Sequence, residues 1–153
     1  MSRGFEYVSN DFRKNENNVE DVGLPRRGTS KSAGYDFKSP IDVIIKPKEI
    51  KLIWSDVKAY MMDDEELLIF PRSSMGKLKV KLANTVAKID ADYHNNPKTD
   101  GNIGLMIEND SDVDFVINKG DRVCQGTFSK YLITDDDCPV SDERVGGMGS
   151  TGK

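Results

Sequence analysis

The sequence predicts an all-β protein, a sandwich or barrel of short strands with one short helix. β-Branched and aromatic residues recur with a period of two in short runs, and turn residues separate these runs at near-regular intervals. The length of 153 residues is typical of one domain. A content of 37% hydrophobic and 31% charged residues predicts a modest core under a polar surface.

The expected strands follow one another between residues 41 and 133. Pro47 and Pro71 end two of them, because proline cannot donate a ladder hydrogen bond. The helix is expected as a short turn after Ser74, around Met75–Lys79. The expected strands are Ile41–Ile45, Lys51–Trp54, Val57–Met61, Glu66–Phe70, Thr85–Ile89, Ile103–Ile107, Val113–Ile117, Val123–Phe128 and Tyr131–Ile133.

Three segments depart from this pattern. Residues 9–21 are rich in Asn and charge and predict a loop or a partly ordered arm, and residues 94–102 predict a long hairpin tip. Residues 135–153 contain several glycines and almost no apolar side chains, so they are expected to order only on a ligand or partner. We therefore expect a β domain over residues 1–134 and a flexible glycine-rich arm over residues 135–153.

Composition excludes several functions. A net charge of −4 argues against a nucleic-acid-binding protein, and no stretch approaches the ~18 apolar residues of a membrane span. Met1–Glu6 lacks an apolar signal core, so a cytoplasmic protein is expected. In that compartment Cys124 and Cys138 are expected as free thiols, with a disulfide as the alternative. His94 is the single histidine, which excludes the common zinc motifs.

The C-terminal glycines match two nucleotide-binding patterns by chance. Residues 147–152 satisfy G-x-G-x-x-G, and residues 147–153 fit most of a Walker A loop. Both motifs need a following helix, and only Lys153 follows, so both interpretations fail. Closely spaced glycines still let backbone amides approach an anion, with Arg144, Ser150 and Thr151 as further donors.

Two other segments could carry chemistry. At Pro71–Gly76 a strand gives way to a helix, where Ser73 or Ser74 could cap and Arg72 could hold an anion. Ile89–Tyr93 places two acids and an aromatic residue at a strand end. Taken singly, the first is better explained as an ordinary capped helix start and the second as an ordinary acidic turn.

Five motifs follow one another along the chain: Ser32–Asp36, Pro71–Ser74, Leu82–Val86 with Ile89–Tyr93, Gly120–Gln125 and Gly146–Gly152. Taken together and in this order, they resemble the motifs of the trimeric dUTP pyrophosphatase (dUTPase) family. The resemblance implies a jelly-roll-like β-barrel with one short helix, assembled as a homotrimer whose active sites lie between subunits. The arm of residues 135–153 would then close a neighbouring subunit's site.

The resemblance also implies the reaction. The family hydrolyses dUTP to dUMP and pyrophosphate, which keeps uracil out of DNA and supplies dUMP. Mg²⁺ is carried by the triphosphate and its waters, with no protein ligand expected. By resemblance, Asp90 is the general base that activates the water attacking the α-phosphorus in line.

Each binding residue also takes its role from the resemblance. Asn84 and the backbone after Val86 are expected to recognise uracil, and Tyr93 to stack under the deoxyribose and exclude a 2′-hydroxyl. Asp36 is expected to support the site without touching the nucleotide, near the waters of the metal ion or near the phosphate-binding arginine. The expected phosphate contacts are Arg72, Ser73, Ser74, Gly76 and Gln125, with Arg144, Met148, Gly149, Ser150 and Thr151 closing from the arm.

The sequence departs from the family pattern in three places. The last motif usually carries an aromatic residue over the uracil where this chain has Met148, so Tyr35 or His94 are alternative covers. The spacing between Arg144 and the glycines is one residue shorter than usual. Residues 95–102 lengthen the expected hairpin.

Two alternative functions stay open at this stage. A dCTP deaminase shares this fold, and pyrophosphate or ammonia as product would separate the two enzymes. A nucleotide-responsive module that binds a regulatory protein is the second alternative. Its candidate contact surfaces are the lengthened hairpin and residues 15–18.

Overall fold

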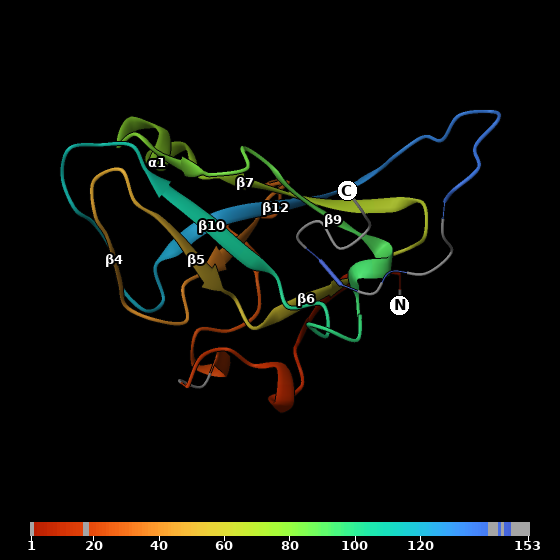
Figure 1. Ribbon diagram of the computed structural model, residues 1–153, viewed down its shortest axis with the longest axis horizontal. Coiled ribbons are helices and arrows are strands. Elements are labelled where there is room, and N and C mark those ends of the chain that lie inside the picture. Colours follow the sequence, from red (N-terminus) through yellow and green to blue (C-terminus); the bar gives the residue numbers. More distant parts are fainter. Residues whose placement is uncertain (1, 17–18, 141–143, 145, 148–153) are drawn as a thin grey trace.

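The structure, a computed structural model, describes residues 2–16, 19–140, 144 and 146–147, and it confirms the predicted β protein (Figure 1). The helical elements are the helix α1 (Ser73–Lys77) and the 3-10 turns η1 (Asn10–Phe12), η2 (Val19–Asp21) and η3 (Ala91–Tyr93). The strands are β1 (Gly4–Tyr7), β2 (Arg26–Arg27), β3 (Tyr35–Lys38), β4 (Val43–Ile45), β5 (Ile50–Trp54), β6 (Val57–Tyr60), β7 (Glu65–Pro71), β8 (Val80–Leu82), β9 (Ala87–Asp90), β10 (Gly104–Asn109), β11 (Phe115–Ile117) and β12 (Arg122–Lys130).

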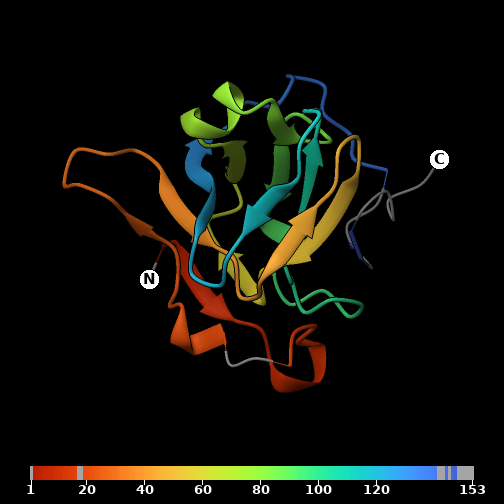
Figure 2. The ribbon, with the colours of Figure 1, turned by 90° about the vertical axis from the view of Figure 1, so that its left-hand side faces the viewer.

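The strands form a jelly-roll-like arrangement of antiparallel sheets. A five-stranded sheet has the order β2-β3-β12-β7-β9, and a three-stranded sheet has the order β5-β10-β8. The pairs β1-β6 and β4-β11 complete the fold. In Figure 1, β5 and β10 cross in front of β12. In Figure 2, α1 lies at the top of the molecule and the N-terminal turns, in red, lie at the bottom.

The core lies between the sheets and follows the period of two. Leu67 and Ile69 on β7 and Leu105 and Ile107 on β10 are buried, because alternate side chains of each strand point inward. Gly126 on β12 sits so close to this core that a Cβ there would come within 3.0 Å of Leu67 and Phe37 side-chain atoms. A side chain at position 126 would therefore push β12 away from the core.

The N-terminal segment is ordered further than its composition predicts. The unpredicted strand β1 pairs with β6, and its Phe5 ring packs edge-on against Tyr35 and Phe37. The segment 9–16 is a loop that is bound to the buried carboxylate of Asp56. This carboxylate accepts the backbone N–H groups of Lys14 and Asn15 at 2.9 and 3.1 Å and the side-chain amides of Asn15 and Asn102 at 2.7 and 2.8 Å. Four donors thus satisfy one buried charge.

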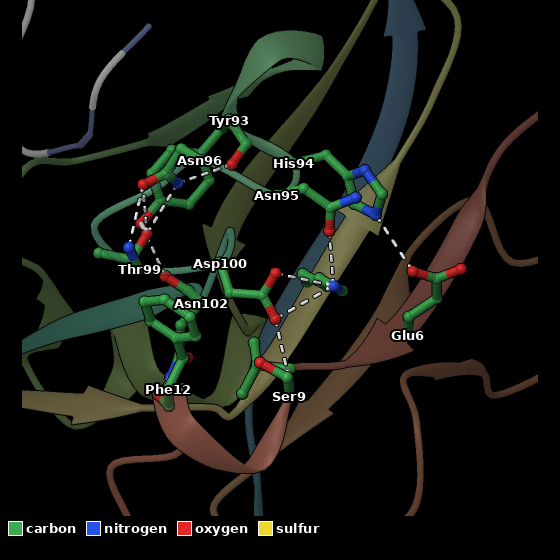
Figure 3. Close-up of polar contacts among 12 residues, drawn as sticks. Glu6, Ser9, Phe12, Tyr93, His94, Asn95, Asn96, Thr99, Asp100 and Asn102 are labelled. Atoms are coloured by element: carbon green, nitrogen blue, oxygen red, sulfur yellow. Dashed lines mark hydrogen bonds and ion pairs between the residues drawn. The ribbon is translucent and has the colours of Figure 1, made fainter.

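The predicted hairpin at 94–102 is wrong. β9 belongs to the five-stranded sheet and β10 to the three-stranded sheet, so residues 91–103 cross from one sheet to the other. Asparagine side chains build this crossing. Asn96 Oδ1 accepts from the backbone N–H groups of Lys98 and Thr99, and Figure 3 shows Asn96 beside Thr99. Asn102 Oδ1 accepts from the backbone N–H of Asp56. The asparagines replace the ladder hydrogen bonds that a hairpin would make.

The predicted strand Tyr131–Ile133 is also wrong. The last pair between β12 and β7 joins Lys130 to Glu65, the first residue of β7, so no strand remains for the following residues to pair with. Leu132 is 97% exposed, and the segment runs out from the body at the upper right of Figure 1.

The remaining differences are small. The helix begins at Ser73, two residues before the expected start, and the strands β1, β2, β3 and β8 lie outside the expected strands. These four strands have at most four residues each, too few for a periodic pattern. None of the helices within the described part of the chain is long and apolar enough to cross a bilayer.

Replacing Asp56 by Asn tests the N-terminal anchor. Asp56→Asn turns one acceptor oxygen into a donor that faces the N–H groups already pointing at it. We expect the free energy of unfolding to fall by about 2 kcal/mol or more in urea titrations. The matched change Asp112→Asn, at a side chain 89% exposed, should stay within about 0.5 kcal/mol of the original protein at the same protein concentration. An equal fall in the free energy of unfolding in the two variants would contradict the role of Asp56 as the anchor of the N-terminal segment.

Candidate active site

A pocket of about 310 Å³ opens beside the end of β9. Its lining includes Asn84, Asp90, Tyr93, Met106 and Gly147 together with Arg144, and we call this set the acidic pocket. Asp90 is the last residue of β9, at the edge of the five-stranded sheet, and η3 begins immediately after it. The end of β9 and the turn η3 thus bring Asp90, the predicted general base, and Tyr93, the predicted sugar contact, into one cavity. The size of this cavity is typical of small-molecule sites.

Tyr93 forms a rigid wall of the acidic pocket. Its hydroxyl donates to the backbone oxygen of Asn102 at 2.7 Å and accepts from Thr99 Oγ1 at 3.2 Å. Burial raises the pKa of Tyr93, so the phenol stays neutral. The Gly147 backbone lies against the ring, and a Cβ there would come 2.5 Å from Tyr93 Cε2. Gly147 can approach the ring because it lacks a side chain.

Arg144 connects the C-terminal segment to the two acids. Its Nη2 lies 2.5 Å from Asp90 Oδ2 and its Nε lies 2.6 Å from Asp92 Oδ1. A guanidinium suits this double contact, because its donors are fixed in one plane. The composition of the tail predicted that it would not pack on its own chain. The described residues Arg144, Gly146 and Gly147 do pack on it, since charge pairing and backbone contact replace apolar burial.

The turn that carries Asn84 holds an uncommon backbone conformation. The Val86 N–H donates to the Asn84 carbonyl at 2.7 Å, which closes a three-residue turn around Thr85. Thr85 has φ of 67°, and the left-handed region is costly for a β-branched residue. Local strain of this kind concentrates at functional sites.

A second group of predicted residues lies at the other end of β7. Asp36 Oδ1 lies 3.4 Å from Arg72 Nε, and Asp36 Oδ2 lies 3.4 Å from Arg122 Nη1. Gln125 is the register partner of Asp36 across β12 and β3. Ser74 shares a surface groove with Arg72 and Arg122. We call Asp36, Arg72, Ser74, Arg122 and Gln125 the arginine cluster.

The helix α1 begins differently from the prediction. Arg72 occupies the position before the first helical residue, and no side chain caps the helix, so neither Ser73 nor Ser74 is the cap. The chain passes directly from β7 into α1 through Arg72, whose guanidinium turns to Asp36. Gly76 is exposed, and a Cβ there would meet no atom within 4 Å.

The acidic pocket and the arginine cluster are separate. Asp90 is paired with Glu66, near the start of β7, whereas Arg72 follows Pro71 at its end. Six residues of extended chain span about 20 Å, so one copy of the chain holds the two groups far beyond hydrogen-bond distance.

Several expected residues contribute elsewhere or cannot be placed. Met148, Gly149, Ser150 and Thr151 lie outside the described residues. Neither alternative cover lines the acidic pocket: Tyr35 packs against Phe5 and Phe128, and His94 Nε2 lies 3.1 Å from Glu6 Oε2.

Three residues were missed from the sequence. Lys88 and Met106 line the acidic pocket, and Arg122 joins the arginine cluster. The position of Lys88 two residues before Asp90 on one strand was a usable signal, because it places both on one face. Arg122 gave no such signal. A register shift between Arg122 and Cys124 sets Arg122 opposite Lys38, on the same face of β3 as Asp36.

Fold and site together define a jelly-roll-like β protein with a pocket of nucleotide size and a separate cationic cluster suited to phosphates. Residues 20–152 match the family model of dUTPase. The chain is 43% identical over 152 residues to the deoxyuridine 5′-triphosphate nucleotidohydrolase of Lactococcus lactis, covering 98% of this chain and 97% of that protein. It belongs to the dUTPase family.

Solved structures agree with this assignment. The Streptococcus mutans dUTPase is 38% identical with a TM-score of 0.76, covering 86% of this chain and 98% of that one. A dUTPase from phage phi11 of S. aureus shares the fold at 21% identity, with a TM-score of 0.68 over 93% of this chain and 99% of that one. That phage structure describes the coordination of a structural Mg(II) ion.

The two cysteines provide a test of burial next to the arginine cluster. Both are free, as expected, with Cys124 buried beside Gln125 and Cys138 exposed. Burial raises the pKa of the Cys124 thiol to about 12, so at pH 8 the thiol is uncharged. Because it is buried, a reagent in solution cannot reach it. We expect a thiol reagent to modify one cysteine of the native chain, Cys138, and both after denaturation, as measured by intact mass. Rapid modification of Cys124 in the native protein would contradict the placement of β12.

Proposed function

We propose that this protein hydrolyses dUTP to dUMP and pyrophosphate, with Asp90 as the general base for the attacking water. The observation that carries the proposal is the Asp90 carboxylate in a pocket of nucleotide size, next to Tyr93 and Asn84, in a chain of the dUTPase family. A carboxylate suits the step, because phosphoryl transfer needs positioning and charge stabilisation with one group taking a proton.

The acidic pocket takes the nucleoside. Asn84 and the strained turn at Thr85 present polar atoms to the base, and a polar pocket rejects an incorrect base by leaving its own groups unpaired. The Tyr93 ring, fixed by its bonds to Asn102 and Thr99, leaves no space for a 2′-hydroxyl. Deoxyuridine is thereby selected over cytosine nucleotides and over UTP.

The arginine cluster takes the triphosphate. Arg72 and Gln125 donate to phosphate oxygens, with Ser73, Ser74 and Gly76 at the start of α1, and Asp36 orients the Arg72 guanidinium. Arg144 exchanges its contact with Asp90 for a phosphate when substrate binds, which leaves Asp90 able to accept a proton. Met148, Gly149, Ser150 and Thr151 close over the nucleotide with the rest of the arm.

Separation of the two groups requires more than one chain per site. Because about 20 Å of β7 lies between Asp90 and Arg72, a triphosphate can contact both only if they come from different copies. We therefore expect a homotrimer in which one chain supplies the acidic pocket and another the arginine cluster. Residues 1–134 form the body and residues 135–153 the arm that completes a site.

Mg²⁺ fits this site as a companion of the substrate. No cluster of three or more metal-ligating side chains occurs in the described ranges, and Mg²⁺ is commonly held by substrate phosphates and waters with few protein ligands. When bound, the ion neutralises charge on the triphosphate. Asp36 is the carboxylate of the arginine cluster that could accept hydrogen bonds from its waters.

The variant Asp90→Asn tests the proposed role of Asp90 as the general base. Asparagine keeps the shape of the side chain but cannot take the proton, so we expect dUTP binding by calorimetry to persist while pyrophosphate release slows at least about 100-fold. The wild-type protein should consume dUTP alone from a panel of dUTP, dTTP, dCTP and UTP with Mg²⁺. Asp92→Asn, which alters the other contact of Arg144, should slow turnover far less. Full turnover by Asp90→Asn would remove Asp90 from this role, and ammonia from dCTP would point to a deaminase.

Mixing inactive variants tests the shared site. Asp90→Asn and Arg72→Ala chains, unfolded together and refolded at equal amounts, should recover about a quarter of wild-type activity, because random trimers combine one intact pocket with one intact cluster. Asp90→Asn mixed with Tyr93→Ala should recover none, because both changes fall in the same acidic pocket. Equal recovery in the two mixtures would refute a site divided in this way.

A further inference from the structure

On the outer face of β7 and β9, two carboxylates, Glu66 and Asp90, lie opposite each other, and Lys88 pairs with the first of them. Lys88 Nζ is 2.8 Å from Glu66 Oε2, and Glu66 is the register partner of Asp90. Lys88 and Asp90 are two residues apart on β9, so their side chains share that face, and both line the acidic pocket. In Figure 1, β9 lies beside β7 at the edge of the sheet.

The two carboxylates would repel each other without this lysine. Side chains directly opposite in an antiparallel pair have Cβ atoms about 5 Å apart, and like charges at this distance destabilise each other. The Glu66 side chain is only 11% exposed, so solvent screens its charge weakly. Ser129 Oγ donates to Glu66 Oε1 at 3.2 Å and fixes the carboxylate in place.

Both members of the ion pair are charged near neutral pH. The contact with the Lys88 ammonium lowers the pKa of Glu66 and outweighs the burial that would raise it. The same contact raises the pKa of Lys88. A compensated pair, rather than a bare anion, therefore faces Asp90.

Other charged groups surround Asp90. Asp63, in the turn before β7, and Asp92, on η3, line a second cavity next to the acidic pocket, together with Lys88, Asp90, Arg144 and the phenol of Tyr131. Lys88 Nζ also lies 5.7 Å from the centre of the Tyr131 ring. When Arg144 contacts phosphate instead of Asp90, Lys88 is the remaining cation among the described residues that line this cavity.

We propose that Lys88 is a positioning residue for catalysis: its ammonium compensates Glu66, so that Asp90 faces a neutralised pair when it takes the proton from water. The inference rests on the proposed dUTP hydrolysis. It assigns no substrate contact to Lys88, which acts through the charge of its neighbours.

The test is the pH dependence of kcat/KM for dUTP, measured from about pH 4.5 to pH 9 with saturating Mg²⁺. Lys88→Met leaves Glu66 uncompensated beside Asp90, so the acidic limb of the profile should move to higher pH by about half a unit or more. Activity above pH 7 should change by less than about threefold, because Lys88 contacts neither the water nor the substrate in this proposal. Lys88→Arg should keep the wild-type limb.

Changes at Glu66 give predictions of opposite sign. Glu66→Gln removes the carboxylate and leaves Lys88 beside Asp90, so the acidic limb should move to lower pH. The double variant Lys88→Met with Glu66→Gln should return most of the way to wild type. Lys81→Met, which breaks the similar 3.6 Å ion pair with Glu108 on the other sheet, serves as the matched control and should not move the limb.

The outcomes separate this inference from the proposed function. No dUTP hydrolysis by the wild-type protein would end the proposed function and this inference with it. Hydrolysis by wild type with the same acidic limb in Lys88→Met would overturn the role of Lys88 alone. A uniform loss of activity at all pH values in Lys88→Met and in the double variant would show a structural role and also overturn it.

Discussion

The length of strand β7 determines how this chain can form a site. Its first residues pair with the strand that ends in Asp90, and its last residue leads to Arg72 and α1. Backbone hydrogen bonds to β9 and β12 fix both registers, and a slip by one residue would turn the buried Leu67 and Ile69 to solvent. The core thus holds the carboxylate and the arginine apart, and that distance is the reason for expecting several chains per site.

Polar side chains stabilise the parts of the fold that regular pairing does not reach. Asp56 binds the N-terminal loop, and Asn96 and Asn102 form the crossing between the two sheets. Lys58 extends this network by contacting Asn95 and Asp100 at 2.6 and 3.0 Å. These buried or half-buried groups are satisfied by one another, which is the condition under which polar networks rigidify a structure.

Sequence reasoning was effective where one strand's own pattern was enough. The alternation of apolar and polar residues predicted β5, β7, β10 and β12 close to their observed bounds. The order of the motifs predicted that Asp90, Tyr93 and Asn84 belong to one site, and these three residues line one pocket. It failed where the outcome depends on a partner. The apolar residues Tyr131–Ile133 have strand-like character but no free strand to pair with, and residues 94–102 look like a hairpin because their two strands follow each other in sequence. Arg122 was missed because a register shift, invisible in the sequence, turns it to the face of Asp36.

The bonds between Tyr93 and the crossing segment have a consequence for fidelity. The Tyr93 hydroxyl is held by Thr99 and by the backbone of Asn102, and Thr99 is held in turn by Asn96 (Figure 3). The ring proposed to discriminate between two sugars is therefore set by the partly buried crossing segment behind it. In the proposed site, a substitution in that segment would change how strictly the protein selects among nucleotides, while the groups proposed to touch the nucleotide stay the same.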